Sequence, residues 1–278
     1  MPRNKSGDQP AFTKVIGKDI SFCGGSADER SHDIATEVPV NVIYGSVPFA
    51  VMMTTPVDLE DFAYGFTFTE GIVDKADDIR DVSIEETQKG IKLSITLRAE
   101  NMQRHLGRAR NLAGRTGCGV CGIADLAEMP SLATRYARPV EFAPTSISKA
   151  LGQMDELQTL NKRTHAVHAA AYCDATGTII ALREDVGRHN ALDKLAGSIL
   201  RDAIEARDGF LLITSRASYE MVEKATRLGV SLLVAISAPT SLAIERANAL
   251  GMTLVGIARA DGAVAFSGPA SLLKGDLG

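Results

Sequence analysis

The sequence predicts a mixed fold, in which a small α+β domain is followed by a larger α/β domain. In the first hundred residues, short segments with alternating apolar side chains surround a single helical pattern. In the second half, three continuous apolar segments alternate with helical patterns, which is typical of parallel strands joined by crossover helices. The 278-residue chain is 45% hydrophobic and 23% charged, so it can bury a sizeable core and has room for two domains.

The amino-terminal part is expected to contain a hairpin, a helix and two further strands. The pattern from Phe12 to Tyr44 favours strands, with apolar residues that alternate from Val38 onward, and a turn at Tyr44–Val47 leads into a further strand that ends at Thr54. Asp58 is in the position of a helix N-cap, and an apolar stripe follows it as far as Gly71. The two further strands are expected at Asp81–Glu85 and Ile91–Leu97.

The carboxyl-terminal part is expected to begin with a helix and an antiparallel pair of strands. The helix is predicted at Ser146–Leu160, and the strands at Ala166–Cys173 and Thr178–Arg183. A second helix follows at Val186–Ala206, with Asp185 as its N-cap. Three buried strands then alternate with two helices, which implies parallel strands with right-handed crossovers. These strands are predicted at Phe210–Thr214, Leu232–Ile236 and Thr253–Ile257, and the helices at Tyr219–Leu228 and Leu242–Leu250.

A glycine-rich segment with two cysteines lies between these parts. Cys118 and Cys121 are two of only four cysteines in the chain, and four glycines bracket them between positions 114 and 122. Because glycine has no side chain to restrict its backbone, we expect a mobile loop here. We therefore predict an amino-terminal α+β domain over residues 12–110, a mobile cysteine loop over residues 111–124 and an α/β domain over residues 125–278.

The segment just before the cysteines is strongly basic inside an acidic protein. Between positions 98 and 115 there is one acid, Glu100, against five arginines: Arg98, Arg104, Arg108, Arg110 and Arg115. These side chains are either a solvated helix face or an electropositive wall beside the thiols. The second interpretation is favoured by position, because guanidinium groups both lower the pKa of a thiol and bind phosphate in a bidentate manner.

Several kinds of chemistry are possible for the cysteine pair. The glycine spacing matches a dinucleotide-binding fingerprint, but no strand precedes it, so we reject that interpretation. A structural zinc site would need two more ligands, and Cys23, Cys173 and the five histidines offer no pair at zinc-finger spacing. A thioredoxin-type pair would need a strand-to-helix junction. Zinc and thioredoxin chemistry stay open but less favoured. The favoured interpretation is a nucleophilic thiol whose pKa nearby arginines lower from about 8.5.

Polar segments elsewhere in the α/β part suggest a binding site. His168-Ala169-Ala170 resembles the H-x-E motif of zinc deaminases, but Ala170 takes the place of the acid. Arg188, His189 and Asn190 are either surface residues or part of a ligand or partner site. Three polar turns follow the parallel strands, where they either cap helices or together bind a phosphate-bearing ligand. These turns are Ser215–Ser218, Ser237–Ser241 and Arg259–Gly262.

The composition disfavours several classes of protein. The net charge is −4, tryptophan is absent and aromatics make up 5% of the chain, so nucleic-acid binding is disfavoured. No segment approaches the roughly 20 apolar residues that span a bilayer, so no membrane association is expected. No secretory signal is recognisable at the amino end, and the small number of cysteines favours a reducing, cytoplasmic compartment.

Five segments together resemble the formate dehydrogenase accessory sulfurtransferase family, FdhD, from about Thr36 onward. The cysteine segment and the E-D-V-G-R-H segment are the most specific of them. The five segments are Glu70–Ile72, Gly114–Gly122, His168–Ala171, Glu184–Lys194 and Ser215–Met221.

The resemblance implies a sulfurtransferase that carries sulfur as a persulfide on Cys118, with Cys121 as its companion. It implies that a cysteine desulfurase supplies the sulfur and that the molybdenum cofactor, in its bis(guanine dinucleotide) form, receives it as a bound substrate, for formate dehydrogenase. No permanent metal is expected. It further implies a homodimer and a cytidine-deaminase-like fold for the carboxyl-terminal three-layer α/β domain.

The resemblance also places a cofactor-binding stretch near the end of the chain. It comprises Ile257, Ala258, Arg259, Ala260, Asp261 and Gly262. Asp261 and Gly262 depart from the glycine and arginine that the family has there, and Arg259 could supply the phosphate contact instead. The alternative function is a non-catalytic chaperone that binds this cofactor for formate dehydrogenase without carrying sulfur, and a zinc-dependent protein is a weaker third.

Overall fold

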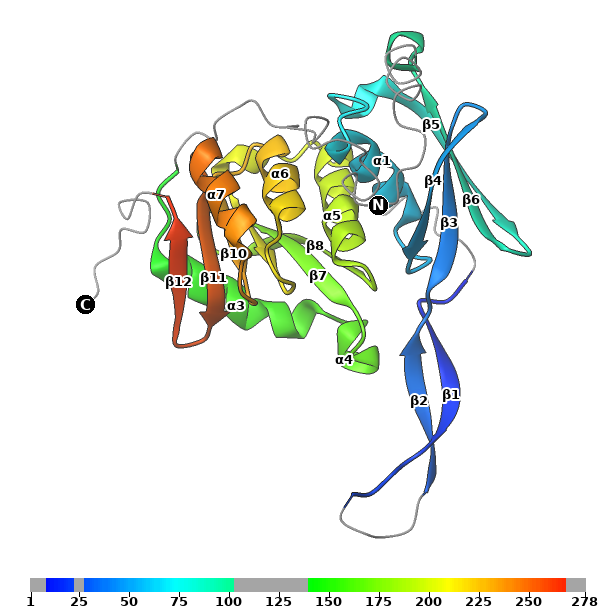
Figure 1. Ribbon diagram of the computed structural model, residues 1–278, viewed down its shortest axis with the longest axis horizontal. Helices are drawn as coiled ribbons and strands as arrows, with labels where there is room; N and C mark the ends of the chain where they lie inside the picture. The colour runs from blue at the N-terminus through cyan, green and yellow to red at the C-terminus, as the bar shows by residue number, and fades with distance from the viewer. Residues whose placement is uncertain (1–8, 23–27, 103–139, 269–278) are drawn as a thin grey trace.

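The computed structural model describes residues 9–22, 28–102 and 140–268, which form three β-sheets and the helices that cover them (Figure 1). The smallest sheet is a two-stranded ribbon, the second has four strands and the third has six. The fold is therefore mixed α and β, as the sequence predicts. No helix within these described ranges is long and apolar enough to cross a membrane.

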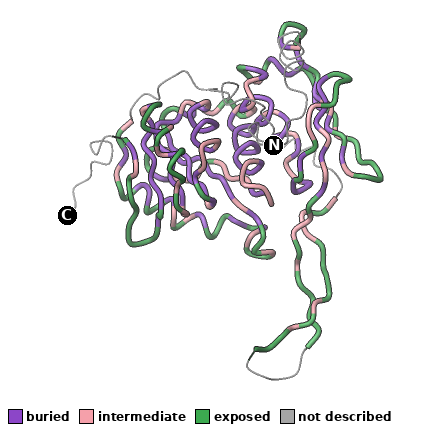
Figure 2. The backbone as a smooth tube through the Cα atoms, in the orientation of Figure 1, coloured by how far each residue is buried: buried purple, intermediate pink, exposed green. Residues whose placement is uncertain are grey.

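The ribbon consists of strands β1 (Phe12–Lys18) and β2 (Glu29–Ala35), which pair antiparallel and extend away from the rest of the molecule (Figure 1). Most of its residues are exposed (Figure 2). At its base, Arg163 forms an ion pair of 2.9 Å with Asp33 and lies 3.9 Å from the centre of the Phe12 ring.

The four-stranded sheet has the order β4-β3-β6-β5. Its strands are β3 (Val38–Tyr44), β4 (Val47–Thr54), β5 (Ile79–Thr87) and β6 (Gly90–Leu97). The predicted hairpin of β3 and β4 and the two further strands are confirmed, and β3 also pairs parallel with β6. Helix α1 (Leu59–Thr69) packs on one face of this sheet, and a short 3₁₀ turn, η1 (Ala76–Asp78), precedes β5.

The prediction that the Asp58 side chain caps helix α1 is wrong. Asp58 precedes the helix but has a left-handed backbone, with φ of 54°, and its side chain makes no capping hydrogen bond. Its carboxylate oxygen instead lies 3.9 Å from the Nε atom of Arg183, in a strand of the six-stranded sheet. A long-range charge contact thus replaces the local cap.

The six-stranded sheet has the order β12-β11-β10-β9-β7-β8. Its strands are β7 (His168–Cys173), β8 (Ile179–Asp185), β9 (Phe210–Ile213), β10 (Leu232–Ala235), β11 (Thr253–Arg259) and β12 (Gly262–Ser267). The predicted parallel arrangement of β9, β10 and β11 is confirmed, as is the antiparallel pair of β7 and β8 at the start. Strand β12, which pairs antiparallel with β11, is not among the sequence predictions.

Helices cover both faces of this sheet, which gives three layers (Figure 1). One face carries α5 (Arg188–Arg201), α6 (Tyr219–Arg227) and α7 (Ser241–Leu250), and the other carries α3 (Pro144–Leu157). The short elements α4 (Asn161–Thr164) and η3 (Ala206–Asp208) lie in the connections. Whether this layered part has the cytidine-deaminase-like fold stays a prediction.

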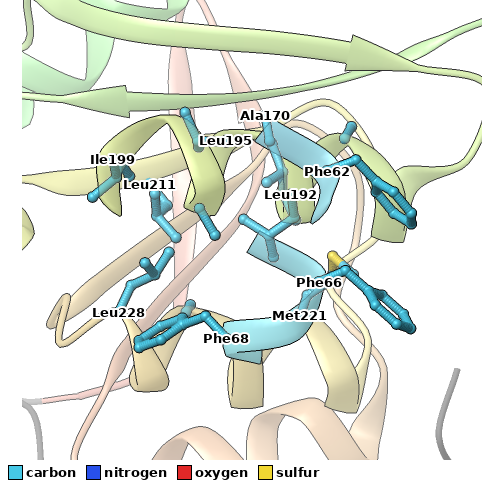
Figure 3. Packing of buried hydrophobic residues seen from close by; sticks show 14 of the residues in the cluster. Phe62, Phe66, Phe68, Ala170, Leu192, Leu195, Ile199, Leu211, Met221 and Leu228 are labelled. Atoms are coloured by element: carbon cyan, nitrogen blue, oxygen red, sulfur yellow. The ribbon is translucent and has the colours of Figure 1, made fainter. Parts of the chain in front are cut away.

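The two larger sheets share one hydrophobic core, because helix α1 packs directly against helix α5 (Figure 3). Gly65 and Gly197 permit this close approach. A Cβ atom on Gly65 would lie 1.7 Å from the Asp193 carbonyl oxygen, and one on Gly197 would lie 1.8 Å from that of Asp61. The predicted domain boundaries near residues 110 and 125 lie outside the described residues, so the division into two domains stays a prediction.

Buried ion pairs accompany this shared core. The Lys194 ammonium lies 2.6 Å from the Asp185 carboxylate, and both side chains are fully buried. Asp185 is the last residue of β8, and α5 starts only after Gly187, so the prediction that Asp185 is the N-cap of this helix is wrong. Its Oδ2 atom also accepts hydrogen bonds from the Thr55 amide and hydroxyl, and its Oδ1 atom accepts from the Gly187 amide and the Asn190 side chain.

Candidate functional site

The carboxyl edge of strands β9, β10 and β11 brings the three predicted polar turns together. The Ile257 amide donates to the Ser237 carbonyl at 3.1 Å, and the Thr240 amide donates to the Ala217 carbonyl at 3.0 Å. Neighbouring turns are therefore hydrogen-bonded to one another. In open α/β sheets this edge is where ligands bind, because helix amino termini present N–H groups there.

Helix capping explains part of the polarity of these turns. The Thr240 hydroxyl accepts a hydrogen bond of 3.3 Å from the Ala243 amide at the start of α7, so it is a cap. Ser218 precedes α6 but makes no such bond, and its hydroxyl donates instead to the Glu220 carboxylate at 2.7 Å. The capping interpretation thus holds for Thr240 and fails for Ser218.

The predicted cofactor-binding stretch, residues 257–262, runs from the end of β11 into the turn before β12. Ile257 has a left-handed backbone, with φ of 53°, and its side chain is 43% exposed. That conformation is rare for a β-branched residue, and such strain is concentrated at functional sites. The Arg259 guanidinium donates to the Ile236 and Ala258 carbonyls. Ala258 itself is buried, so it could contact a ligand only through its backbone.

A second group of polar side chains lies farther along the same edge, around the start of β7. We call His168, Arg188, His189 and Arg216 the basic cluster; they come from β7, from the first turn of α5 and from the loop after β9. The start of β7 lies beside the end of β9, because the Ala169 amide donates to the Thr214 hydroxyl at 2.9 Å.

The side chains of the basic cluster interact electrostatically. Burial lowers the pKa of His168 from its ordinary value, and the positive charges of Arg188 and Arg216 lower it further. The carboxylate of Asp185 and the imidazole of His189 have smaller and opposite influences on this pKa. His168 is therefore held in its neutral form near neutral pH.

The guanidinium groups of this cluster have no counter-ion among the residues that the structure describes. Neither Arg188 nor Arg216 forms an ion pair with a described carboxylate. Within the described part of the chain, the Nε atom of Arg188 is buried without a hydrogen-bond partner, and the same is true of the Nε2 atom of His189. Buried donors of this kind normally have a partner, so their occurrence together calls for an explanation.

Two carboxylates that neighbour the cluster, Asp185 and Glu220, do not pair with its arginines. Asp185 is paired with Lys194 in the interior, as described above. Glu220 lies 3.9 Å from the Nε2 atom of His189, too far for a hydrogen bond but close enough for a charge contact. The neighbouring His189 imidazole, aided by the Ser218 hydroxyl, lowers the pKa of Glu220 to about 2. The basic cluster thus keeps an excess of positive charge.

A cavity of about 420 Å³ lies along the free edge of strand β8. Its charged side chains have partners already. The Arg183 guanidinium donates to Asp61, and the Glu184 carboxylate accepts from the amides of Leu160 and Asn161. The sheet edge, which has uncompensated charge, is therefore the stronger candidate site.

The predicted thiol site itself lies outside the described residues, as do Cys118, Cys121 and the arginines from Arg104 to Arg115. Arg98 is described, and its Nε atom donates to the Asp77 carbonyl at 2.6 Å. Cys173 is buried, which raises the pKa of its thiol to about 12 and makes it a poor nucleophile. Within the described ranges, no three His, Cys, Asp or Glu side chains gather closely enough to hold a metal ion.

Sequence reasoning did not single out the buried lysines that organise this region. Lys194 pairs with Asp185, and the Lys224 ammonium lies 2.7 Å from the Asp193 carboxylate. One signal could have drawn attention to Lys194: it lies with Asp193 between Leu192 and Leu195, next to the apolar stripe of α5. Charged residues on such a stripe are buried only when they are paired.

Comparison with known proteins assigns a family to this chain. The model of the FdhD/NarQ family matches residues 35–273. A sulfur carrier protein FdhD of Xanthomonas euvesicatoria pv. vesicatoria is 46% identical over 92% of this chain and 90% of its own. That of Cupriavidus necator is 43% identical over 86% and 83% of the two chains. A crystal structure from Desulfotalea psychrophila, assigned to a formate dehydrogenase accessory protein, is 25% identical. It has a TM-score of 0.73 and covers 95% of this chain and 100% of that one.

Proposed function

Because the chain belongs to the FdhD/NarQ family, we propose that it is a sulfurtransferase that carries sulfur as a persulfide on Cys118. The acceptor is the molybdenum cofactor in its bis(guanine dinucleotide) form, and the dependent enzyme is a formate dehydrogenase. Support comes from relatives called sulfur carrier protein FdhD and from a structural neighbour assigned to a formate dehydrogenase accessory protein. We also propose a cytidine-deaminase-like fold for the three-layer part, supported by its antiparallel start and the helices on both faces.

The observation that carries the proposal is the position of residues 257–262 at the carboxyl edge of parallel strands. A dinucleotide cofactor is anionic, and this edge offers the guanidinium of Arg259 and the amino terminus of α7. The exposed side chain of Ile257, held in a strained conformation, adds an apolar surface suited to a base or pterin ring. These residues would bind and orient the cofactor while the thiol carries the sulfur.

The loading step follows from the chemistry of thiolates. The Cys118 thiolate attacks the outer sulfur of a cysteine persulfide on the desulfurase. A new S–S bond forms on Cys118, the S–S bond of the donor breaks, and the donor cysteine leaves as a thiolate. Arginines such as Arg115 favour the attacking form, because a nearby positive charge stabilises a thiolate. Cys121, three residues along, is the companion that assists release.

Mass spectrometry after incubation with cysteine and a cysteine desulfurase tests this step. We expect the peptide containing Cys118 to gain the mass of one sulfur atom, and Cys118→Ala to prevent the gain. Cys23→Ala is the matched control, because Cys23 is isolated from the pair in the sequence. Unchanged loading of the Cys118→Ala protein would show that the carrier is another residue.

A non-catalytic chaperone is the second candidate, and one observation favours it. The cations at the sheet edge could hold an anionic cofactor without any contribution from the cysteines. In that case a Cys118→Ala protein would still activate formate dehydrogenase. The sulfurtransferase proposal expects no activation by this variant.

We also propose that the chain forms a homodimer through the β1–β2 ribbon. Ile16 is 66% exposed and Phe22 is 99% exposed, and an isolated two-stranded ribbon is marginally stable in water. These exposed apolar side chains favour a second copy of the ribbon as the partner, and the 3.1 Å contact of Arg30 with Asp19 pairs two of its charges internally. Sedimentation should show a dimer that dissociates in Phe22→Asp, whereas dimers of unchanged affinity would exclude this interface.

A further inference from the structure

We propose that the basic cluster of His168, Arg188, His189 and Arg216 is an anion site of its own, distinct from residues 257–262, and that it takes a phosphate or pyrophosphate group. The site is inferred from its own side chains and does not depend on sulfur transfer. Its ligand would belong to the same molecule as the cofactor of the proposed function, if that function holds.

Two buried hydrogen-bond donors of the basic cluster lack an acceptor among the described residues. The Nε atom of Arg188 and the Nε2 atom of His189 are both buried, and neither has a hydrogen-bond partner among the described residues, although Glu220 lies 3.9 Å from the second. Folded proteins avoid leaving such donors unpaired in the interior. An oxygen-rich anion would satisfy both.

No carboxylate in the described ranges forms an ion pair with Arg188 or Arg216. Asp185 is the carboxylate closest in sequence to Arg188, but it is neutralised by Lys194 at 2.6 Å and by hydrogen bonds from Thr55. Glu220 is the other, and its carboxylate is shared by the Ser218 hydroxyl and the His189 side chain. Arg188 and Arg216 thus retain their full charge toward a ligand.

The chemical groups of the basic cluster suit a phosphate ligand. A guanidinium group is a planar fork of donors that binds phosphate oxygens in a bidentate manner. Helix α5 has 14 residues and begins at Arg188, so its amino terminus adds N–H groups and the positive end of the helix dipole. Burial and the positive charges of Arg188 and Arg216 lower the pKa of His168, which shows that both guanidinium groups act on this side chain.

The basic cluster lies apart from the cofactor-binding stretch at residues 257–262. The sheet order places β11, which ends at Arg259, three strands from β7, which starts at His168. Neighbouring strands lie roughly 4.8 Å apart, so the two positions are about 14 Å from one another along the edge. One phosphate group cannot reach both. The edge therefore offers two anion sites, suited to one ligand with two separated phosphate groups or to two ligands.

Calorimetric titration of the full chain with inorganic pyrophosphate tests the inference. We expect two sites per chain. Arg188→Gln and Arg216→Gln should each weaken one of them about tenfold or more, as expected for loss of a charge-assisted bidentate contact. Arg259→Gln should weaken only the other. Arg30→Gln, which removes the same charge from the exposed ribbon, is the matched control and should change neither.

Imidazole NMR signals provide a second readout, which does not depend on the variants. Pyrophosphate should shift the ring signals of His168 and His189 and leave those of His165, which lies outside the cluster, in place. Two results would overturn the inference. One is native affinity at both sites in the Arg188→Gln and Arg216→Gln proteins. The other is complete loss of binding in Arg259→Gln alone. Failure of Cys118 to load sulfur would contradict the proposed function and leave this site untouched.

Discussion

Replacing Lys194 by methionine should destabilise the protein strongly. Lys194 and Asp185 are both 0% exposed, and the ammonium also donates to the Thr55 hydroxyl at 2.8 Å and to the Thr55 carbonyl at 3.1 Å. Methionine fills much of the same volume but leaves the Asp185 carboxylate buried without a cation. Breaking one partner of a buried pair costs about 3 to 5 kcal/mol.

The size of the effect can be measured by urea unfolding followed by circular dichroism. We expect the unfolding free energy of Lys194→Met to be lower than that of the native protein by this amount. The melting temperature should decrease by about 6 to 20 °C, since each kcal/mol corresponds to roughly 2 to 4 °C for a chain of this size. The double variant Asp185→Asn/Lys194→Met should lose about 1 to 3 kcal/mol less than the sum of the two single variants, because their effects are coupled.

Lys92 provides the matched control for this substitution. Its ammonium lies 3.4 Å from the Glu85 carboxylate, but both side chains are exposed, so Lys92→Met should change the unfolding free energy by at most about 1 kcal/mol. If Lys194→Met is no more damaging than Lys92→Met, the buried pair does not stabilise the junction between the two larger sheets, and the reasoning is refuted.

Three further predictions concern packing, pH and reactivity. Gly65→Ala should destabilise the protein by about 1 to 3 kcal/mol in the same unfolding assay, because the new methyl group would collide with the Asp193 carbonyl; an unchanged midpoint would contradict the close helix crossing. The pKa of Glu220 is lowered from 4.5 to about 2, so its contribution to stability is complete above pH 4.5 and is lost as the pH falls toward 2. Discounted for solvent screening, that contribution is about 1 kcal/mol, and the difference between native and Glu220→Gln proteins should shrink over this range. A constant difference would exclude the charge contact with His189. Cys173, whose pKa burial raises to about 12, should resist alkylation in the folded protein and react after unfolding; rapid labelling of the native chain would show that it is accessible.

Local patterns in the sequence predict most of the larger fold. The apolar segments that become β9, β10 and β11 alternate with amphipathic helices, and this periodicity alone determines their parallel arrangement. The predicted strand character from Phe12 onward is confirmed by β1 and β2, but the sequence does not separate them as a ribbon, because their side chains bury little and leave a weak pattern. Strand β12 is not among the predictions because it follows β11 after only a tight turn and most of its residues are exposed.

The errors at helix starts have a different origin. Asp58 and Asp185 both stand where an N-cap is expected, and nothing in their own segments argues against it. Their actual partners, Arg183 and Lys194, are supplied by other parts of the fold. Capping is a local inference, so it fails where a long-range charge competes for the same carboxylate.

The candidate site illustrates the same limit. The sequence draws attention to Arg188 and His189 and to the turn that contains Arg216, yet it gives no reason for them to meet. They meet because β7 pairs antiparallel with both β8 and β9, so the end of β8, which leads into α5, and the end of β9 both lie beside the start of β7. That pairing places a strand start and a strand end at one edge, and no local pattern encodes it.

The pairing of Asp185 with Lys194 connects the stability of this protein to its charge at the sheet edge. Asp185 precedes Arg188 by three residues and could have neutralised it across the first turn of the helix. The fold instead turns this carboxylate inward to Lys194 and Thr55, where it joins the six-stranded sheet to the four-stranded one. Arg188 is left with its charge and an unsatisfied Nε donor. The contact that holds the two sheets together is therefore also the reason that the edge stays positive and able to bind an anion.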